Sequence, residues 1–413
     1  MRIALPSLGS IVIILLILES FVVKSVIFDK NDPVLIHYLL SGLLISAICG
    51  LTALRRSSWQ RLRLLPGVNI LLITVVWLVV VTTSRPSALE WAAVLGFLLL
   101  VSGFYLSIPI SLCATSATTP RRIITYFLAA WVILSLLTLV ISPAMSYELP
   151  SLRFRGALIS VANACNIFFF ATIYFAWSYK YEFLLRRSVS GFLAALSFVF
   201  LLMTLTRSSV TLAILGLVVL GATDRNGSLR GFKIASILIV ISISLIVVVM
   251  SISTTTLESI RLGGDLLSSR DLVWDDGLSR IRETFLLGSG LLTKQTKGGS
   301  ADLEFSSSNY DPAFDAHSLA ITLIEQGGIL MLVLVMALLL FPLWRFMRVF
   351  GLRASLQQPE FLIMTLVVPS MIFAGGDMIS LGSLVNRLQW LFLGILALDV
   401  ANQRSLINRA HSP

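Results

Sequence analysis

Long apolar runs, separated by short polar connections, make up most of this sequence. A run of about 17 to 25 apolar residues crosses the ~30 Å hydrocarbon layer of a membrane as one α-helix. The twelve candidate spans are residues 8–28, 34–54, 64–83, 88–112, 123–142, 157–178, 189–205, 208–222, 232–253, 318–341, 361–378 and 385–401. Because 57% of the residues are hydrophobic and only 13% are charged, a soluble globule is excluded. We therefore predict an all-α polytopic membrane protein.

The basic residues indicate the orientation of these spans. Lys and Arg favour the cytoplasmic side of short loops, and here they favour the side that holds the N-terminus. Both chain termini are therefore predicted to be cytoplasmic. The first run is expected to be a retained span, because no small-residue cleavage site follows it. The net charge of +10 is explained by this topology and by contact with anionic membrane lipids, so no nucleic-acid partner is expected.

One polar segment, residues 254–316, is much longer than the other connections and divides the chain into three parts. Residues 1–253 hold spans one to nine, residues 254–316 form an outer subdomain, and residues 317–413 hold spans ten to twelve and a cytoplasmic tail. Apolar residues at helical spacing between Leu266 and Leu287 predict one or two helices on the membrane surface. The Gly- and Ser-rich stretch that follows predicts a loop that covers a substrate.

His317 lies where the polar segment meets the tenth span, in Asp315-Ala316-His317-Ser318. A neutral histidine can take the proton of a hydroxyl group as a general base. The alternative is a polar side chain that bonds a neighbouring backbone group at a helix end. The position at the membrane surface, beside the longest polar segment, favours the catalytic interpretation.

Among the arginines outside the cytoplasmic basic clusters, four adjoin spans and one opens the amphipathic stretch of the polar segment: Arg153, Arg155, Arg207 and Arg387, and Arg270. Each by itself is explained as a side chain that extends to the membrane interface. As a set they break the charge rule for outer loops. Guanidinium groups form paired hydrogen bonds with phosphate oxygens, so several that converge on one outer site would hold a pyrophosphate.

The acidic residues and cysteines give little support for a metal site. The sequence has no Asp-x-Asp, no His-Glu-x-x-His and no group of His and Cys at ligand spacing. Asp29 and Asp32 are the best carboxylate candidates, but beside Lys30 and Pro33 they are explained more simply as a polar turn. Glu325, about two turns into the tenth span, is either functional or the partner of an arginine that keeps the helices in register. We therefore expect neither a metal nor a cofactor.

Several short motifs occur in a fixed order along the second half of the chain. They are Arg207-Ser208-Ser209, Ser269-Arg270 with Trp274, Leu287-Gly288-Ser289-Gly290, His317-Ser318 with Glu325-Gln326-Gly327-Gly328, and Asn386-Arg387-Leu388-Gln389-Trp390. In order and spacing, over about residues 150–395, they resemble the O-antigen ligase/polymerase superfamily. The stretch from Arg153 to Asn166 is similar to the family's Arg…Gly…Pro-Asn element, with Asn163 at the asparagine, Ala162 at the proline, and Asn166 as the alternative asparagine.

The resemblance implies a membrane glycosyltransferase of the all-helical GT-C-like class, with its active site at the periplasmic face of the bacterial inner membrane. Such an enzyme moves a glycan from undecaprenyl pyrophosphate to an acceptor, which is lipid A–core in a ligase and another lipid-linked glycan in an O-antigen or exopolysaccharide polymerase. The compact length and the single sizeable outer segment favour the ligase. The implied roles are catalysis for His317, pyrophosphate binding for Arg207, Arg270, Arg153 and Arg155, and support for Glu325, Asn163 and Arg387.

Chemistry also favours a lipid-linked donor. No nucleotide sugar or ATP is available on the outer face, so a transferase there needs an activated donor that arrives attached to a lipid. Departure of the pyrophosphate builds negative charge that fixed arginines stabilise, and a single displacement inverts the anomeric centre. A transporter of lipid-linked glycans is the alternative from another class, since it too has many spans and intramembrane charges. The concentration of charge at one face and the lack of duplication between the two halves favour the enzyme.

Overall fold

The computed structural model describes residues 34–54, 63–84, 88–113, 119–148, 153–158, 160–181, 183–223, 285–288, 318–374 and 383–410, together with Leu15, Glu19, Leu278, Ile281 and Arg282. The predicted spans 8–28 and 232–253 and most of the predicted outer subdomain, residues 254–316, lie outside this part of the chain. The candidate site residues His317, Arg270, Asp29 and Asp32 also lie outside it.

Helices make up nearly all of the described chain, as predicted. They are α2 (Val34–Ala53), α4 (Val68–Ser84), α5 (Ala88–Leu100), the π-helical segment η1 (Val101–Ser107), α6 (Ile108–Cys113), α7 (Thr119–Ile141), the 3-10 turn η2 (Pro143–Ser146), α8 (Val161–Tyr181), α9 (Arg187–Met203), α10 (Arg207–Ala222), α14 (Leu319–Phe350), α15 (Leu352–Leu356), α16 (Pro359–Ala374) and α17 (Leu384–Ala410). A helix lies over each predicted span that falls within the described residues.

Five helices in the described part are long and apolar enough to cross a membrane by length and composition. They cover Glu90–Ser111, Thr119–Ile141, Val161–Tyr181, Leu319–Phe350 and Leu384–Gln403. Five further helices are apolar but shorter, and they correspond to α2, α4, α9, α10 and α16. The protein is therefore mostly helical with several helices able to span a membrane, and the total of twelve spans stays a prediction.

A small β-hairpin, which the all-α prediction did not include, connects α7 with α8. β1 (Tyr147–Glu148) pairs antiparallel with β2 (Arg153–Phe154), so that Tyr147 lies opposite Phe154 and Glu148 opposite Arg153. Phe154 is fully buried, and its ring centroid lies 5.9 Å from that of Phe168 in α8. Strands of two residues are too short to show the alternating pattern of a sheet. Phe154 packs against Phe168 of α8 and so stabilises the hairpin. No local sequence pattern predicts this contact.

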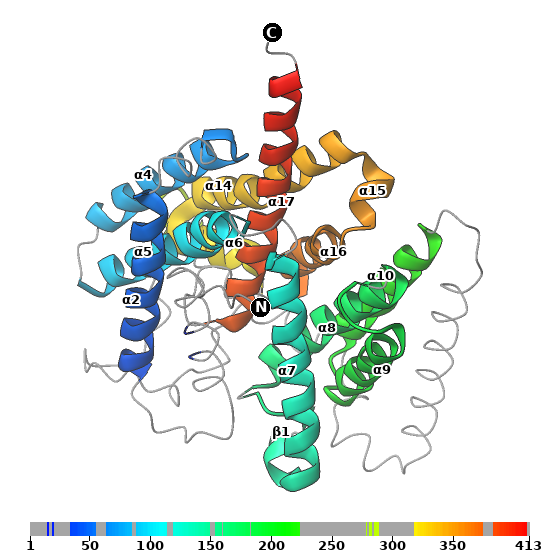
Figure 1. Cartoon of the computed structure of the whole chain (residues 1–413). Coiled ribbons are helices and arrows are strands. Elements are labelled where there is room, and N and C mark those ends of the chain that lie inside the picture. The colour runs from blue at the N-terminus through cyan, green and yellow to red at the C-terminus, as the bar shows by residue number, and fades with distance from the viewer. Residues whose placement is uncertain are drawn as a thin grey trace.

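Polar contacts define two ends of the helix bundle. Lys180 at the end of α8 donates to the carbonyl of Leu220 at the end of α10 at 2.6 Å. Arg121 in the first turn of α7 pairs with Glu360 at the start of α16 and with Asp399 in the second half of α17. We call this side the Arg121 end. The hairpin, the end of α9 and the start of α10 lie together at the opposite side, the hairpin end; β1 lies near the bottom of Figure 1 and the last turns of α17 near its top.

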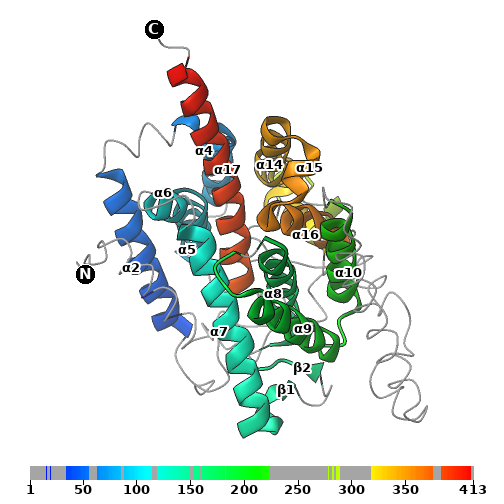
Figure 2. The same cartoon turned by 45° about the vertical axis from the view of Figure 1, so that its right-hand side comes forward.

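The central helix of the bundle is α17, which packs against η1, α14, α16 and α8 (Figures 1 and 2). A Cβ atom on Gly394 would lie 2.4 Å from the carbonyl oxygen of Tyr105 in η1, so the two backbones are in direct contact. Trp390 is fully buried one turn earlier and makes edge-on contacts with Phe97 and Tyr105. The predicted span 88–112 is thus a helix with a π-helical middle, and its widened turn lies against α17.

Candidate functional site

The α9–α10 break, at Thr204–Thr206, is the first notable feature of the hairpin end, and it falls where the sequence predicted an interruption between two spans. Leu205 adopts a φ of 55°, a left-handed conformation that costs a non-glycine residue about 1 kcal/mol or more. Arg153 supports this turn: its Nε donates to the carbonyl of Thr204 at 3.0 Å, and its Nη2 donates to Thr206 Oγ1 at 2.8 Å. Arg153 therefore links β2 to the break and satisfies a carbonyl at the end of α9.

Arg207 is the first residue of α10 and directly follows the threonine that Arg153 binds. Its side chain is exposed, as is that of Ser208, whereas Ser209 is buried. The N-terminus of a helix carries backbone N–H groups without intrahelical partners and the positive end of the helix dipole, both of which favour anions. The start of α10 thus combines an exposed guanidinium group with a helix N-terminus, which is an arrangement suited to phosphate.

Arg155 follows β2 and Asn163 lies in the first turn of α8, and each donates a hydrogen bond to a nearby group. Arg155 Nε donates to a carbonyl of η2 at 3.2 Å. Asn163 Nδ2 donates to the hydroxyl of Ser160 at 3.1 Å, and the Asn166 amide donates to a carbonyl one turn earlier in α8. The pyrophosphate-binding role of Arg155 and the supporting role of Asn163 stay predictions.

Arg387, which the sequence grouped with the outer arginines, is explained by a buried ion pair. Its Nη1 lies 2.9 Å from Glu19 Oε2, and its Nη2 donates to Ser41 Oγ at 2.7 Å. Ser41 in turn donates to Glu19 Oε1 at 2.6 Å, and none of the three residues is more than 5% exposed. Glu19 belongs to the first predicted span, 368 positions away in the sequence. Arg387 therefore neutralises an acid inside the apolar bundle.

The predicted tenth span is interrupted and is not one continuous helix. Gly328 has φ 76° and ψ 178°, a conformation that is essentially restricted to glycine. It divides α14 into a short half-helix, residues 319–327, and a long second part, residues 329–350. The second part continues nine residues beyond the predicted boundary at residue 341.

A turn from the polar segment, residues 285–288, packs into this break. The backbone N–H of Ile329 donates to the carbonyl of Phe285 at 2.8 Å. A Cβ atom on Gly328 would lie 1.9 Å from the carbonyl oxygen of Leu286, and one on Gly288, at φ 72°, would lie 2.5 Å from the carbonyl of Gln326. Two glycine motifs that are separate in the sequence thus meet backbone to backbone.

The half-helix begins immediately after His317. Ser318 is buried, and its Oγ accepts the backbone N–H of Ile321 as an N-cap, which confirms the predicted helix start. Glu325 is 5% exposed and lies one turn before the break. The indole N–H of Trp77 in α4 donates to the carbonyl of Gly327 at 2.8 Å.

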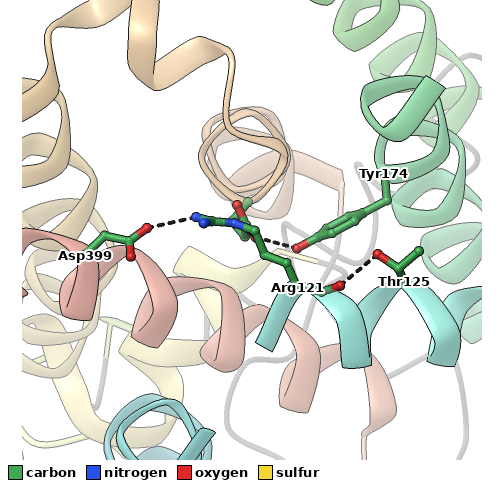
Figure 3. Close-up of polar contacts among 5 residues, drawn as sticks. Arg121, Thr125, Tyr174 and Asp399 are labelled. Carbon is green, nitrogen blue, oxygen red and sulfur yellow. Dashed lines mark hydrogen bonds and ion pairs between the residues drawn. The ribbon is translucent and has the colours of Figure 1, made fainter. Parts of the chain in front are cut away.

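Sequence reasoning missed a buried polar cluster at the Arg121 end (Figure 3). Arg121 Nε lies 2.9 Å from Glu360 Oε1, and its Nη2 lies 2.8 Å from Asp399 Oδ2. The hydroxyl of Tyr174 donates to Glu360 Oε1 at 2.6 Å. The charge bias of the sequence predicts no more for Arg121 than a place on the cytoplasmic side, but its contacts join α7, α16 and α17, and Tyr174 adds α8 through Glu360. The acids at the edges of two apolar runs were the available clue, since such acids need a cationic partner.

The described residues contain no group of three His, Cys, Asp or Glu side chains able to hold a metal ion. Asp29 and Asp32, the alternative carboxylate candidates, lie outside the described residues. Metal independence therefore stays a prediction.

A comparison with known protein families finds a match in the region that contains the α9–α10 break and the half-helix of α14. Residues 192–336 match a family model described as O-antigen ligase. The matched stretch runs from α9 through the α9–α10 break, Arg207 and the turn at 285–288 to the half-helix and the first turns beyond Gly328. A comparison with curated proteins finds no match. The match supports a relationship of residues 192–336 to the O-antigen ligase superfamily.

Proposed function

We propose that this protein is an O-antigen ligase, an inverting glycosyltransferase of the bacterial inner membrane. It moves O-antigen polysaccharide from undecaprenyl pyrophosphate to lipid A–core at the periplasmic face, in a GT-C-like bundle of about twelve spans with both termini in the cytoplasm. The observation that carries the proposal is the arrangement within the family-matched region. Arg207 at the start of α10 and the half-helix that follows His317 both belong to the matched residues 192–336.

The proposed reaction is a single displacement at the anomeric carbon of the donor. The acceptor hydroxyl loses its proton to His317 as the new glycosidic bond forms and the bond to pyrophosphate breaks. Arg207 and Arg270 stabilise the negative charge on the departing pyrophosphate. Arg153, with two of its guanidinium N–H groups bonded to Thr204 and Thr206, holds the backbone that carries Arg207.

The proposed charge stabilisation needs no divalent ion. Purified protein given lipid-linked donor and lipid A–core is therefore expected to transfer glycan at an unchanged rate in excess EDTA. Transfer that stops in EDTA and returns with Mg²⁺ or Mn²⁺ contradicts this expectation and directs attention to Asp29 and Asp32.

Lipopolysaccharide from a deletion strain distinguishes the ligase from a polymerase. Loss of a ligase leaves bare lipid A–core on a gel while long polymer accumulates on the lipid carrier. Loss of a polymerase leaves lipid A–core that carries a single repeat, and this second pattern would contradict the ligase assignment. Complementation with His317→Ala is expected to reproduce the deletion pattern, because the acceptor hydroxyl then lacks its base. Full restoration by His317→Ala removes the general-base role.

A further inference from the structure

The interruption of α14 leaves backbone groups on both sides of Gly328 without their usual helical partners. In a continuous helix each carbonyl accepts the N–H four residues later, and a break ends this pattern. Two contacts from outside the helix compensate at the break: the carbonyl of Phe285 accepts the N–H of Ile329, and the indole of Trp77 donates to the carbonyl of Gly327. The last residue of the half-helix, Gly327, is therefore held by the side chain of Trp77 from α4.

Trp77 is well placed to fix the orientation of the half-helix. It lies in α4, which packs directly against α14, and it is half-buried between the core-facing Leu78 and the exposed Val76. The contact joins residues 250 positions apart. Trp77 also lies outside the family-matched residues 192–336, so the half-helix depends on a part of the chain that the motifs do not include.

We propose that Trp77 is a positioning residue for the transfer reaction: its indole N–H fixes the half-helix that starts beside His317 and carries Glu325. The expected effect on catalysis rests on the proposed function, whereas the positioning of the half-helix by Trp77 does not. A short helical segment has little rigidity of its own, so the loss of one tie at its end lets it tilt. Small misplacements of this kind cost up to about 10²-fold in rate even when the altered residue does not contact the substrate.

The test is Trp77→Phe, which keeps an aromatic ring in the same place and removes the N–H donor. We expect kcat for glycan transfer to fall about tenfold with KM for the lipid-linked donor unchanged, because orientation of the reacting groups is altered and donor binding is not. Trp91→Phe is the matched control, since Trp91 in α5 is 41% exposed, and it is expected to match the wild type. An equal fall in kcat in Trp77→Phe and Trp91→Phe, or wild-type kcat in Trp77→Phe, overturns the proposal.

A second measurement is independent of activity. Hydrogen exchange followed by mass spectrometry on Trp77→Phe is expected to show faster exchange in residues 319–327 and unchanged exchange in residues 329–350. If the wild-type protein transfers no glycan, the proposed function fails, but the exchange measurement still tests whether the Trp77–Gly327 hydrogen bond holds the half-helix. Wild-type exchange in residues 319–327 overturns the inference even when the enzyme is active.

A second variant covers the case in which Trp77→Phe does not fold. Incorporation of benzothienylalanine at position 77 keeps the bicyclic ring and replaces the N–H group by sulfur. The same loss of kcat and the same local increase in exchange are expected. Wild-type values of both with this isostere overturn the role of the indole N–H.

Discussion

The arginines that the sequence singled out differ in their surroundings. Arg153 bonds the α9–α10 break, Arg387 is buried against Glu19, and the side chain of Arg207 is exposed at the start of α10. Arg207→Lys keeps the charge and loses the two-pronged geometry. We expect it to lower kcat/KM for the lipid-linked donor by about 10²-fold in a purified transfer assay, since loss of one fixed charge-stabilising donor costs about 10² to 10³ in rate.

The control for Arg207→Lys is Arg122→Lys, because Arg122 is also exposed but lies beside Arg121, at the opposite end of the bundle. This variant is expected to retain wild-type kcat/KM. Wild-type activity in Arg207→Lys would show that a point charge is sufficient and would remove the paired contact with pyrophosphate from the mechanism.

Two glycines of α14 with similar backbone angles allow the cost of backbone strain to be distinguished from the cost of a steric clash. Gly328 in the α14 break and Gly351 at the end of α14 have similar backbone angles, φ 76° and ψ 178° against φ 80° and ψ 154°. An added Cβ at Gly351 meets nothing within 4 Å, but at Gly328 it would lie 1.9 Å from the carbonyl of Leu286. Gly351→Ala is therefore expected to cost about 1 to 3 kcal/mol from backbone strain alone.

Gly328→Ala carries the same strain and also displaces the turn at 285–288. We expect a clearly larger fall in melting temperature than for Gly351→Ala, measured on detergent-solubilised protein, and loss of transfer activity. Equal melting temperatures for the two variants would mean that the turn does not pack into the break. Gly288→Ala, which meets the backbone of Gln326 from the other side, is expected to resemble Gly328→Ala.

The orientation of the whole molecule in the membrane is predicted from the charge bias of the sequence. Arg186 is the N-cap of α9, and Arg348 lies in the last turn of α14. Reporter fusions at Arg56, Arg186, Arg230 and Arg348 are expected to report the cytoplasm, and fusions within residues 290–310 the periplasm. A cytoplasmic result for residues 290–310 would put His317 in the compartment that holds nucleotide sugars, and the argument for a lipid-linked donor would fail.

Local patterns were sufficient for most helices in the part of the chain that the structure describes. Apolar runs of membrane-spanning length predicted a helix at each described span, and the gap between the predicted spans 189–205 and 208–222 corresponds to the separation of α9 from α10. Ordered motifs predicted the resemblance to the O-antigen ligase family whose model matches residues 192–336. These features succeed because run length, helix caps and interrupting residues act within a few positions along the chain.

Contacts between distant segments were decided only by the tertiary structure. The sequence gave Arg387 a supporting role without showing its partner, because Glu19 is 368 positions away. It gave Arg121 no role because Glu360 and Asp399 lie on other helices. It also treated the tenth span as continuous, since the turn that packs into Gly328 belongs to another segment. A charge inside an apolar bundle and a glycine inside a helix acquire their meaning from whichever segment packs against them, and packing is not encoded in any local pattern.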